Sequence, residues 1–296
     1  MSFISIFSFA LMLLVVRGSE NQLDKWKALE QKIRQMAAAS GGTVAVAFED
    51  LVTGEQLLIN ETVAMHAAST MKTPVMIEVF KQAELGGLNL SDSILVKNEF
   101  RSIVDGSRFT LSRISDSDSS VYRHIGSKLP IRDLVVQMIT RSSNLATNLL
   151  VELVGVENIM ATMKSIGANR IQILRGVEDP KAFERGLNNT TDAYDMLLIM
   201  KAIAKKQILS ENACNEMLSI LLDQKLNRKI PALLPPGTKV AHKTGSITGI
   251  DHDAAIVYKS DDHPYVLVIL TKDISSHIRA EKLIAQISKL IYDAVE

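Results

Sequence analysis

The sequence predicts an α+β fold: an antiparallel sheet of about five strands, built from both ends of the chain and flanked by helices, with an all-helical lobe inserted. Three observations predict it. Segments with the composition of strands lie in residues 43–60 and again in residues 239–273. The long stretch between them has mostly helical spacing. Finally, an amphipathic helix is expected at each end of the chain, where it would cover the sheet.

The first sixteen residues, MSFISIFSFALMLLVV, are apolar and almost uncharged. This segment is too short for a comfortable membrane span and has the length of a signal-peptide core. Val16–Gly18 places small or apolar residues where a cleavage site before Ser19 needs them. We therefore expect a signal peptide over residues 1–18, export to the periplasm or the cell exterior, and no stable membrane span after cleavage. A retained N-terminal anchor helix is the alternative.

The next segments predict a helix and a β-hairpin. Apolar residues recur at helical spacing between Leu23 and Met36, and Gly41 and Gly42 form a typical stop. The strands TVAVAFED and EQLLIN follow, joined by a turn that contains Gly54.

The middle of the chain predicts helices, and its end returns to strands. A polar run, residues 115–128, interrupts the helices and is expected to be a surface loop, to which the sequence assigns no function. The expected helices cover residues 69–85, 131–140, 144–153, 156–166, 191–206 and 210–222. Three strands (239–246, 253–260 and 265–273) and an amphipathic helix (276–295) then close the chain.

These elements predict one catalytic domain over residues 19–296, divided into two lobes. The sheet lobe takes about 19–66 and 236–296, and the helical lobe takes about 67–235. A cleft between two such lobes is a natural place for a site.

Composition excludes several classes of protein. Lys and Arg together number 33, as do Asp and Glu, so no basic excess points to nucleic acid. Cys214 is the only cysteine, which rules out an internal disulfide, and we expect it to be a packing residue on a helix. The six histidines lack the spacing of a metal site. We expect no nucleic-acid partner, no cofactor and no metal, and a monomer.

The stretch AASTMKTPVM carries the first chemical signal. Ser69 and Lys72 are three residues apart at the start of a predicted helix, so Lys72 can reach the Ser69 hydroxyl. A serine needs such a base to become a nucleophile, and a helix N-terminus favours a developing oxyanion. Taken alone, however, this pattern is more often a helix cap beside a solvated lysine.

Two further motifs follow in order. TRSSNLATNLL places Ser142 and Asn144 at a break between two helices, and VAHKTGSITG places Lys243, Thr244 and Gly245 on a predicted strand. Each has an ordinary structural interpretation, as a helix cap or as a strand that ends in a turn. Their joint occurrence, each in a suitable element, is much harder to explain structurally.

The order S-x-x-K, S-x-N, K-T-G resembles that of class A serine β-lactamases and the related penicillin-binding proteins. The resemblance extends over most of the chain after residue 18 and is especially close in MITRSSNLATNLLVELVG. It implies a hydrolase for which a small-molecule β-lactam is the substrate.

The resemblance also implies roles for individual residues. Ser69 would attack the lactam carbonyl, with the backbone N–H groups of Ser69 and Ser246 as the oxyanion hole. Lys72 would be the base, directly or through a relay. Ser142 would pass a proton to the lactam nitrogen, and Asn144 would hold Lys72 and the substrate amide. The substrate would be bound by Lys243, Thr244, Gly245 and Ser246. Of these, Lys243, Thr244 and Ser246 would bind its carboxylate.

Deacylation needs a carboxylate that can activate a water molecule. In the family this carboxylate is the glutamate of the motif E-x-x-L-N. FERGLNN gives Glu184 and Asn188 at this spacing, and the resemblance implies that Glu184 is catalytic and Asn188 binds substrate. Arg185 stands where the family has a proline, and the loop after Asn188 is short. Glu178, in VEDPK, is therefore the second candidate for activating the water.

A further departure concerns the substrate carboxylate. Many class A enzymes carry an arginine on the strand after K-T-G, but here the strand reads GIDHDAAIV. Arg279, on the last predicted helix, could reach the site from the side, or could be an ordinary solvated arginine.

Two other functions remain open. Without an effective deacylating carboxylate the protein would be a D,D-peptidase-like penicillin-binding protein or an esterase-like serine hydrolase. A binding or sensor module on the same fold would be indifferent to loss of Ser69, but such a module has little reason to keep the full set of catalytic residues.

Overall fold

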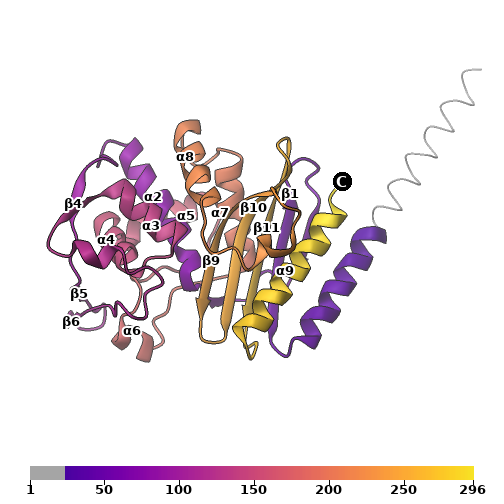
Figure 1. The fold of residues 1–296 in the computed structure, drawn as a ribbon, viewed down its shortest axis with the longest axis horizontal. Coiled ribbons are helices and arrows are strands. Elements are labelled where there is room, and N and C mark those ends of the chain that lie inside the picture. The colour runs from indigo at the N-terminus through magenta and orange to yellow at the C-terminus, as the bar shows by residue number, and fades with distance from the viewer. Residues whose placement is uncertain (1–23) are drawn as a thin grey trace, which may run out of the picture.

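The computed structural model describes residues 24–296, so the predicted signal peptide lies outside the described residues. A five-stranded antiparallel sheet with the spatial order β2-β1-β11-β10-β9 is its central feature (Figure 1). Two strands come from near the start of the chain and three from its end, so the predicted α+β fold is confirmed. The strands are β1 (Thr43–Asp50), β2 (Gln56–Ile59), β9 (Lys239–Ile247), β10 (Ile250–Ser260) and β11 (His263–Lys272).

The sheet is covered on both faces, which explains why long runs of residues in its strands are buried without alternation. In β1 every residue after Thr43 is buried. Residues 24–39 are helical and, with α9 (His277–Ala294), cover one face through a core that includes Ile33, Ile284 and Ile287. The ends of these two helices meet where Lys25 Nζ lies 3.3 Å from Glu296 Oε1.

The other face carries the helix-rich part of the molecule, which lies to the left in Figure 1. Here α7 (Ala193–Ala204) packs on β1, β10 and β11, and the remaining helices pack beyond it in a second, larger core. These helices are α2 (Lys72–Glu84), α3 (Ile131–Thr140), α4 (Asn144–Val154), α5 (Val156–Ser165) and α8 (Glu211–Leu222). The short helix α6 (Pro180–Glu184) contributes no residue to this core.

Short elements connect these layers and shape the region between them. They are β3 (Met65–His66), β4 (Ser93–Leu95), β5 (Phe100–Arg101), β6 (Arg108–Phe109), β7 (Lys128–Pro130), β8 (Thr190–Thr191) and the 3₁₀ turns η1 (Ala68–Met71), η2 (Val121–His124) and η3 (Ile230–Leu233).

Two sequence expectations need correction. The predicted helix over 69–85 begins as the 3₁₀ turn η1, and the α-helix proper starts only at Lys72. The polar run 115–128 is not a plain surface loop, because Asp116, Asp118, Val121 and Tyr122 within it are buried. Its apolar pair joins the larger core, and its aspartates bind backbone N–H groups that would otherwise lack partners.

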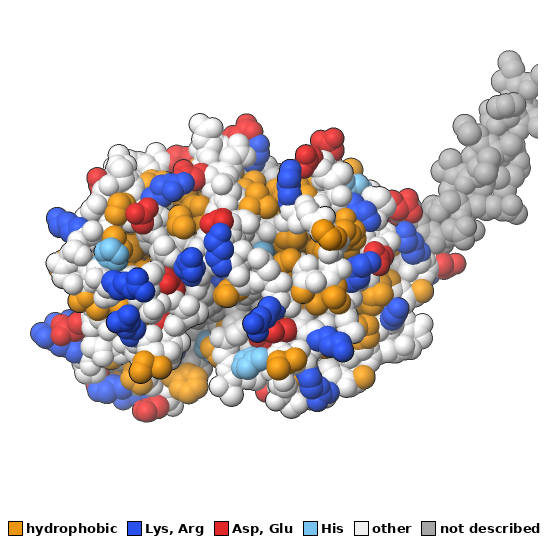
Figure 2. Space-filling model, in the orientation of Figure 1, with side chains coloured by type: hydrophobic (Ala, Val, Ile, Leu, Met, Phe, Trp, Pro, Cys, Tyr) orange, Lys and Arg blue, Asp and Glu red, His pale blue; other side chains and the backbone are white. Residues whose placement is uncertain are grey.

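Acidic and basic side chains are scattered together over the face shown in Figure 2, in keeping with the balanced charge of the sequence. Within residues 24–296, no single helix has the length and apolarity to cross a membrane. α4 and α5 have the required length and apolarity only when they are taken together, and the pair is bent by 82°.

Candidate active site

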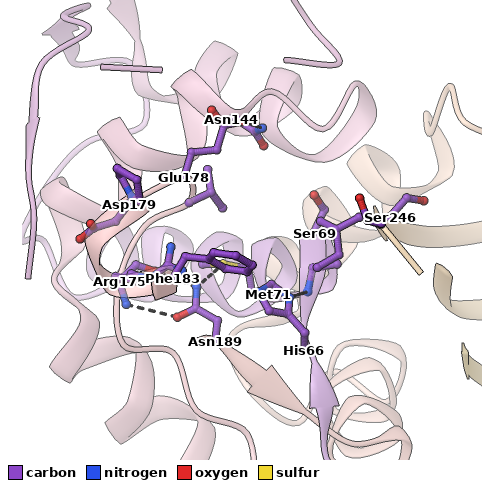
Figure 3. Close-up of a pocket in the computed structure, with 15 residues that line it drawn as sticks. His66, Ser69, Met71, Asn144, Arg175, Glu178, Asp179, Phe183, Asn189 and Ser246 are labelled. Atoms are coloured by element: carbon purple, nitrogen blue, oxygen red, sulfur yellow. Dashed lines mark hydrogen bonds between the residues drawn. The ribbon is translucent and has the colours of Figure 1, made fainter. Parts of the chain in front are cut away.

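A cavity of about 440 Å³ lies where η1, α4, the loop before α6 and the end of β9 come together. Figure 3 shows Ser69 and Ser246 on one side of it, with Asn144 and Glu178 across from them. Fifteen residues line it: His66, Ala68, Ser69, Met71, Asn144, Arg175, Val177, Glu178, Asp179, Pro180, Phe183, Asn189, Ser246, Ile247 and Thr248.

Ser69 sits in the middle of η1 and is half-buried. Ala68 before it has φ +46°, a conformation that an L-residue rarely adopts, and its N–H donates to Nδ1 of His66 at 3.0 Å. Among the described residues no partner meets the Ser69 hydroxyl, which therefore remains available to a substrate.

Gly245 lets strand β9 lie directly against this turn. A Cβ at Gly245 would stand 3.1 Å from Ser69 N and 3.2 Å from Thr70 N, tighter than ordinary contact. β9 is the edge strand of the sheet, so its outer side faces η1 rather than another strand. The backbone after Gly245, at Ser246, thus reaches the same cavity as Ser69.

Lys72 is completely buried and makes three hydrogen bonds, all to Ser142 and Asn144 where the turn after α3 leads into α4. Its Nζ donates to the Ser142 carbonyl at 2.6 Å, to Ser142 Oγ at 3.1 Å and to Asn144 Oδ1 at 2.8 Å. Burial lowers the pKa of Lys72 to about 7, against the opposing pull of Asp116 and Glu178. A neutral amine is consequently accessible near neutral pH.

The Ser142 hydroxyl is shared by two buried lysines. Lys243 Nζ donates to Ser142 Oγ at 3.1 Å, the same distance as Lys72, and to the Thr244 carbonyl at 2.8 Å. Burial and the nearby Lys72 lower the pKa of Lys243 well below its usual range. Because Ser142 Oγ accepts from both amines, its own proton is free to be donated elsewhere.

Asn144 connects Lys72 to a carboxylate. Its Nδ2 donates to Glu178 Oε1 at 2.6 Å, while its Oδ1 accepts from Lys72. Partial burial of the Glu178 carboxyl raises its pKa, and the hydrogen bond from Asn144 offsets part of that rise. Glu178 lines the cavity and faces Ser69 across it (Figure 3).

The backbone that carries Glu178 is held by a second asparagine of α4. Asn148 Oδ1 accepts from Val177 N at 2.6 Å and its Nδ2 donates to the Val177 carbonyl at 3.0 Å. Asn144 and Asn148 are one helical turn apart and so lie on the same face of α4. A Cβ on Gly176 would stand only 2.3 Å from Asn148 Oδ1, so this approach requires glycine.

Glu184 and Asn188 are not brought into the cavity. Glu184 is the last residue of α6 and is exposed, whereas Phe183 beside it lines the site. Asn188 Oδ1 accepts from the Arg175 guanidinium at 3.3 Å, and its neighbour Asn189 lines the site instead. The glutamate and asparagine of the E-x-x-L-N spacing therefore lie outside the cavity, and Glu178 is the candidate carboxylate that lines it.

Backbone strain is concentrated at this site. Six residues other than glycine have positive φ within residues 24–296, and three of them are Ala68, Ser142 and Glu178. Each precedes or carries a candidate catalytic group. Such conformations cost about 1–3 kcal/mol apiece and persist only where the surroundings impose them.

A buried cation, Lys229, lies behind the end of β9, whereas the sequence offers Arg279 as a candidate for this place. Lys229 is buried, and its Nζ donates to the Gly245 carbonyl and to Ser246 Oγ, both at 2.8 Å. Asp251 Oδ1 pairs with it at 3.0 Å. Arg279 instead donates to Ser275 Oγ and lines a separate hollow with residues of the first helix.

Several site residues were not found from the sequence. Three of them belong to no recognised motif: Phe183, Asn189 and Lys229. Only the folded chain brings them near Ser69 or Ser246. The sequence does carry a signal for Asn148, because an asparagine one turn after Asn144 in a mostly apolar helix needs hydrogen-bond partners if it is buried. Within residues 24–296, no group of three or more His, Cys, Asp or Glu side chains is placed to hold a metal ion.

The arrangement suits acyl transfer. It combines a free serine hydroxyl, a buried amine with a pKa near neutrality, a hydroxyl positioned to pass on a proton, and a separate carboxylate on the far side of the cavity.

Comparisons with known proteins agree with this chemistry. The model of the β-lactamase enzyme family matches residues 28–295. The extended-spectrum β-lactamase PER-1 of Pseudomonas aeruginosa is 24% identical, with 89% of this chain and 86% of PER-1 covered. The solved β-lactamase of Sphaerobacter thermophilus is 26% identical with a TM-score of 0.77, over 89% of this chain and 95% of that one. The solved structure of PBP-A is equally similar, at 26% identity and a TM-score of 0.77, over 90% and 95% of the two chains.

Proposed function

Because the chain belongs to the β-lactamase enzyme family, we propose that it hydrolyses β-lactams through an acyl-enzyme formed on Ser69. It is an enzyme, a serine hydrolase of the class A type. The proposal concerns the substrate and the residues that act on it.

In the acylation step, the Ser69 oxygen attacks the lactam carbonyl carbon and its proton passes to neutral Lys72, directly or through Ser142. The backbone N–H groups of Ser69 and Ser246 stabilise the oxyanion. The carbon–nitrogen bond of the ring then breaks, and Ser142 gives its proton to the departing nitrogen while it takes a proton from Lys72, which returns to the neutral amine. The close contact of Gly245 with η1 and the shared bonds of Ser142 support this sequence.

In the deacylation step, Glu178 takes a proton from a water molecule that attacks the ester carbonyl of Ser69. The ester bond to Ser69 then breaks, the product leaves as the carboxylic acid, and the proton held by Glu178 returns to the Ser69 oxygen. The Glu178 carboxyl lies on the cavity wall opposite the serine, bound to Asn144. Lys243, Thr244 and Ser246 receive the substrate carboxylate, with Lys229 adding positive charge behind Ser246. Phe183, Ile247 and Thr248 border the space left for the rest of the substrate.

One observation carries the proposal. Asn144 bonds the Lys72 amine with its oxygen and the Glu178 carboxylate with its nitrogen, in a cavity that also exposes Ser69. A base for acylation and a separate base for deacylation are thereby held on one side chain, which is what two-step hydrolysis requires.

The test is intact-protein mass spectrometry of the enzyme mixed with benzylpenicillin, together with the optical loss of the lactam. We expect a transient adduct, continuing lactam loss, and neither in the Ser69→Ala variant. Labelling of Ser69→Ala at the parent level would refute the proposal.

The second candidate is a penicillin-binding D,D-peptidase or esterase-like hydrolase. The similarity to PBP-A favours it, and another solved structure of that protein, also 26% identical, is the acyl-enzyme complex of a mutant with penicillin G. A persistent stoichiometric adduct without turnover would select this candidate, and peptide and ester substrates would then be assayed.

The chain is further proposed to be exported and to act on β-lactam antibiotics outside the cytoplasm, as a monomer with no nucleic-acid partner. The apolar segment over residues 1–16 supports export. The mass of the protein recovered from the periplasm or medium tests it, since cleavage before Ser19 gives a defined N-terminus.

A further inference from the structure

Asp116 is a buried carboxylate that touches the site from a segment without any recognised motif. It lies in the loop that precedes η2 and is 8% exposed. Both of its carboxylate oxygens accept from the backbone N–H of Asn144 at 3.0 Å, and Oδ2 also accepts from Leu145 N at 3.0 Å. It therefore binds the first two free N–H groups of α4.

The rest of this helix end is satisfied locally. The Ser143 side chain caps α4 by accepting from Ala146 N at 3.3 Å. The same loop also holds the turn on its other side, because Ser117 Oγ donates to the Ser142 carbonyl at 3.1 Å. That carbonyl is also the acceptor for Lys72. The loop therefore binds both Ser142 and Asn144, the two residues that position Lys72.

Three charged groups converge on Asn144. Its backbone N–H is bound by Asp116, its side-chain oxygen by Lys72 and its side-chain nitrogen by Glu178. The charged groups around Lys72 are thus Asp116 from the loop, Glu178 from the segment before α6 and Lys243 from β9.

The electrostatic effect of Asp116 follows from its place. Its negative charge raises the pKa of Lys72, opposing burial, and it also raises the pKa of Glu178. A carboxylate at a helix N-terminus is itself favoured by the helix dipole.

We propose that Asp116 is a positioning residue of the catalytic site, which fixes Asn144 and balances the charge on Lys72; its effect on turnover rests on the function proposed above. In the S-D-N form of the second motif an aspartate stands between the serine and the asparagine. This chain has Ser143 there, and the carboxylate comes from the loop instead.

The first test measures the pKa of Lys72 directly and does not depend on any substrate. The protein is labelled with ¹³C-lysine, the Lys72 signal is identified by its loss in Lys72→Met, and its shift is followed against pH. We expect Asp116→Asn to lower the Lys72 pKa by about one unit, since a neighbouring charge within a few ångströms shifts a pKa by that order.

Asp118→Asn is the matched control. Asp118 is a buried carboxylate of the same loop, but its oxygens accept from the backbone N–H and hydroxyl of Ser120, and it has no hydrogen bond to α4 among the described residues. Its loss should leave the Lys72 titration as in the parent. Equal titration in the Asp116→Asn, Asp118→Asn and parent proteins would overturn the proposal.

The second test measures acylation by benzylpenicillin against pH. The acid limb of the rate should move to lower pH in Asp116→Asn and stay in place in Asp118→Asn. A double variant, Asp116→Asn with Ser143→Asp, returns a carboxylate to the same helix end and should restore both titrations toward the parent. If Asp116→Asn alone does not fold, the double variant replaces it in the test. A Lys72 pKa that is still lowered by about one unit in the double variant would contradict the proposal. Failure of the parent to react with penicillin would count against the proposed function only, because the lysine titration is independent of it.

Discussion

Glu178 and Glu184 belong to the same short segment but have different surroundings. Glu178 has a left-handed backbone, lines the cavity and accepts a hydrogen bond from Asn144. Glu184 ends α6 and is exposed. Only Glu178 lines the cavity that Ser69 also lines, and reach of the reacting proton is the first requirement of a general base, so we propose Glu178 for this role.

The two glutamates give a matched pair of variants. Glu178→Gln is expected to slow deacylation about 100-fold or more, since general base catalysis contributes about 10²–10⁴-fold, and to accumulate the acyl-enzyme. Glu184→Gln should turn over penicillin at the parent rate. Mass spectra recorded during turnover distinguish the two, and adduct accumulation in Glu184→Gln instead would return the role to the E-x-x-L-N glutamate.

Lys72 makes the stability of the protein depend on pH. Its pKa is about 7 in the folded chain, below the value of 10.5 for an unperturbed lysine. Between these values the unfolded chain holds the proton and the folded chain does not, so raising the pH favours folding. Below about pH 7 both states are protonated and this contribution is constant.

We therefore expect the parent to gain unfolding free energy relative to Lys72→Met from about pH 7 upward, by as much as about 1.4 kcal/mol per pH unit. Urea unfolding of both proteins at pH 7, 8 and 9 measures the difference. Lys243 remains in both proteins, so its direct contribution largely cancels. Parallel pH dependence in the two proteins would mean that Lys72 stays protonated in the fold.

At the scale of elements, α4 organises the site. Its N-terminus brings Ser142 and Asn144 against Lys72, and one turn later Asn148 holds the segment that carries Glu178. η1 and β9 provide the other wall, in contact at Gly245. A change in how the segment that carries Glu178 packs on α4 should therefore affect deacylation more than acylation.

Gly176→Ala tests this dependence. The new Cβ would collide with Asn148 Oδ1, and the shift would break the two bonds that hold Val177. We expect acylation of Ser69 to remain within a few-fold of the parent, while the acyl-enzyme persists longer. Gly87→Ala is the control, because its Cβ would meet only ordinary contacts at 3.4 Å or more. Single-turnover labelling and the decay of the adduct are the measurements, and an unchanged decay in Gly176→Ala would argue against the role of this contact.

At the scale of the molecule, the sheet separates two hydrophobic cores. The smaller one joins the terminal helices to the sheet and contains Ile33, and the larger one fills the helix-rich part and contains Leu150 of α4. The candidate site lies at the edge of the larger core. Stability and chemistry should accordingly respond differently to cavities in the two cores.

Ile33→Ala and Leu150→Ala make this comparison at two fully buried positions. Each should lower the unfolding free energy by about 2–5 kcal/mol, the usual cost of such a truncation. The folded Ile33→Ala protein should acylate and deacylate at parent rates, whereas Leu150→Ala should change deacylation because it loosens α4. Denaturant titration and penicillin turnover at 25 °C check both, and an equal loss of turnover in the two variants would show that the cores are coupled.

The extent of sequence prediction differs between fold and site for a physical reason. Strand and helix periods are local, so they were enough to predict the α+β class, the five-stranded sheet and most helices, with errors at boundaries such as the start of α2. The residues of the three motifs are also found in or beside the cavity, since each motif lies within one element or turn.

Short-range spacing therefore encodes the family, the fold class and the groups around Ser69, and all three can be obtained from the order of the residues. Three other features depend on the folded chain: Glu178 rather than Glu184 lines the cavity and binds Asn144, Lys229 binds Ser246, and Asp116 binds α4. These contacts join residues far apart in the chain, and no local period or spacing specifies which distant polar group meets another when the loops fold onto the core.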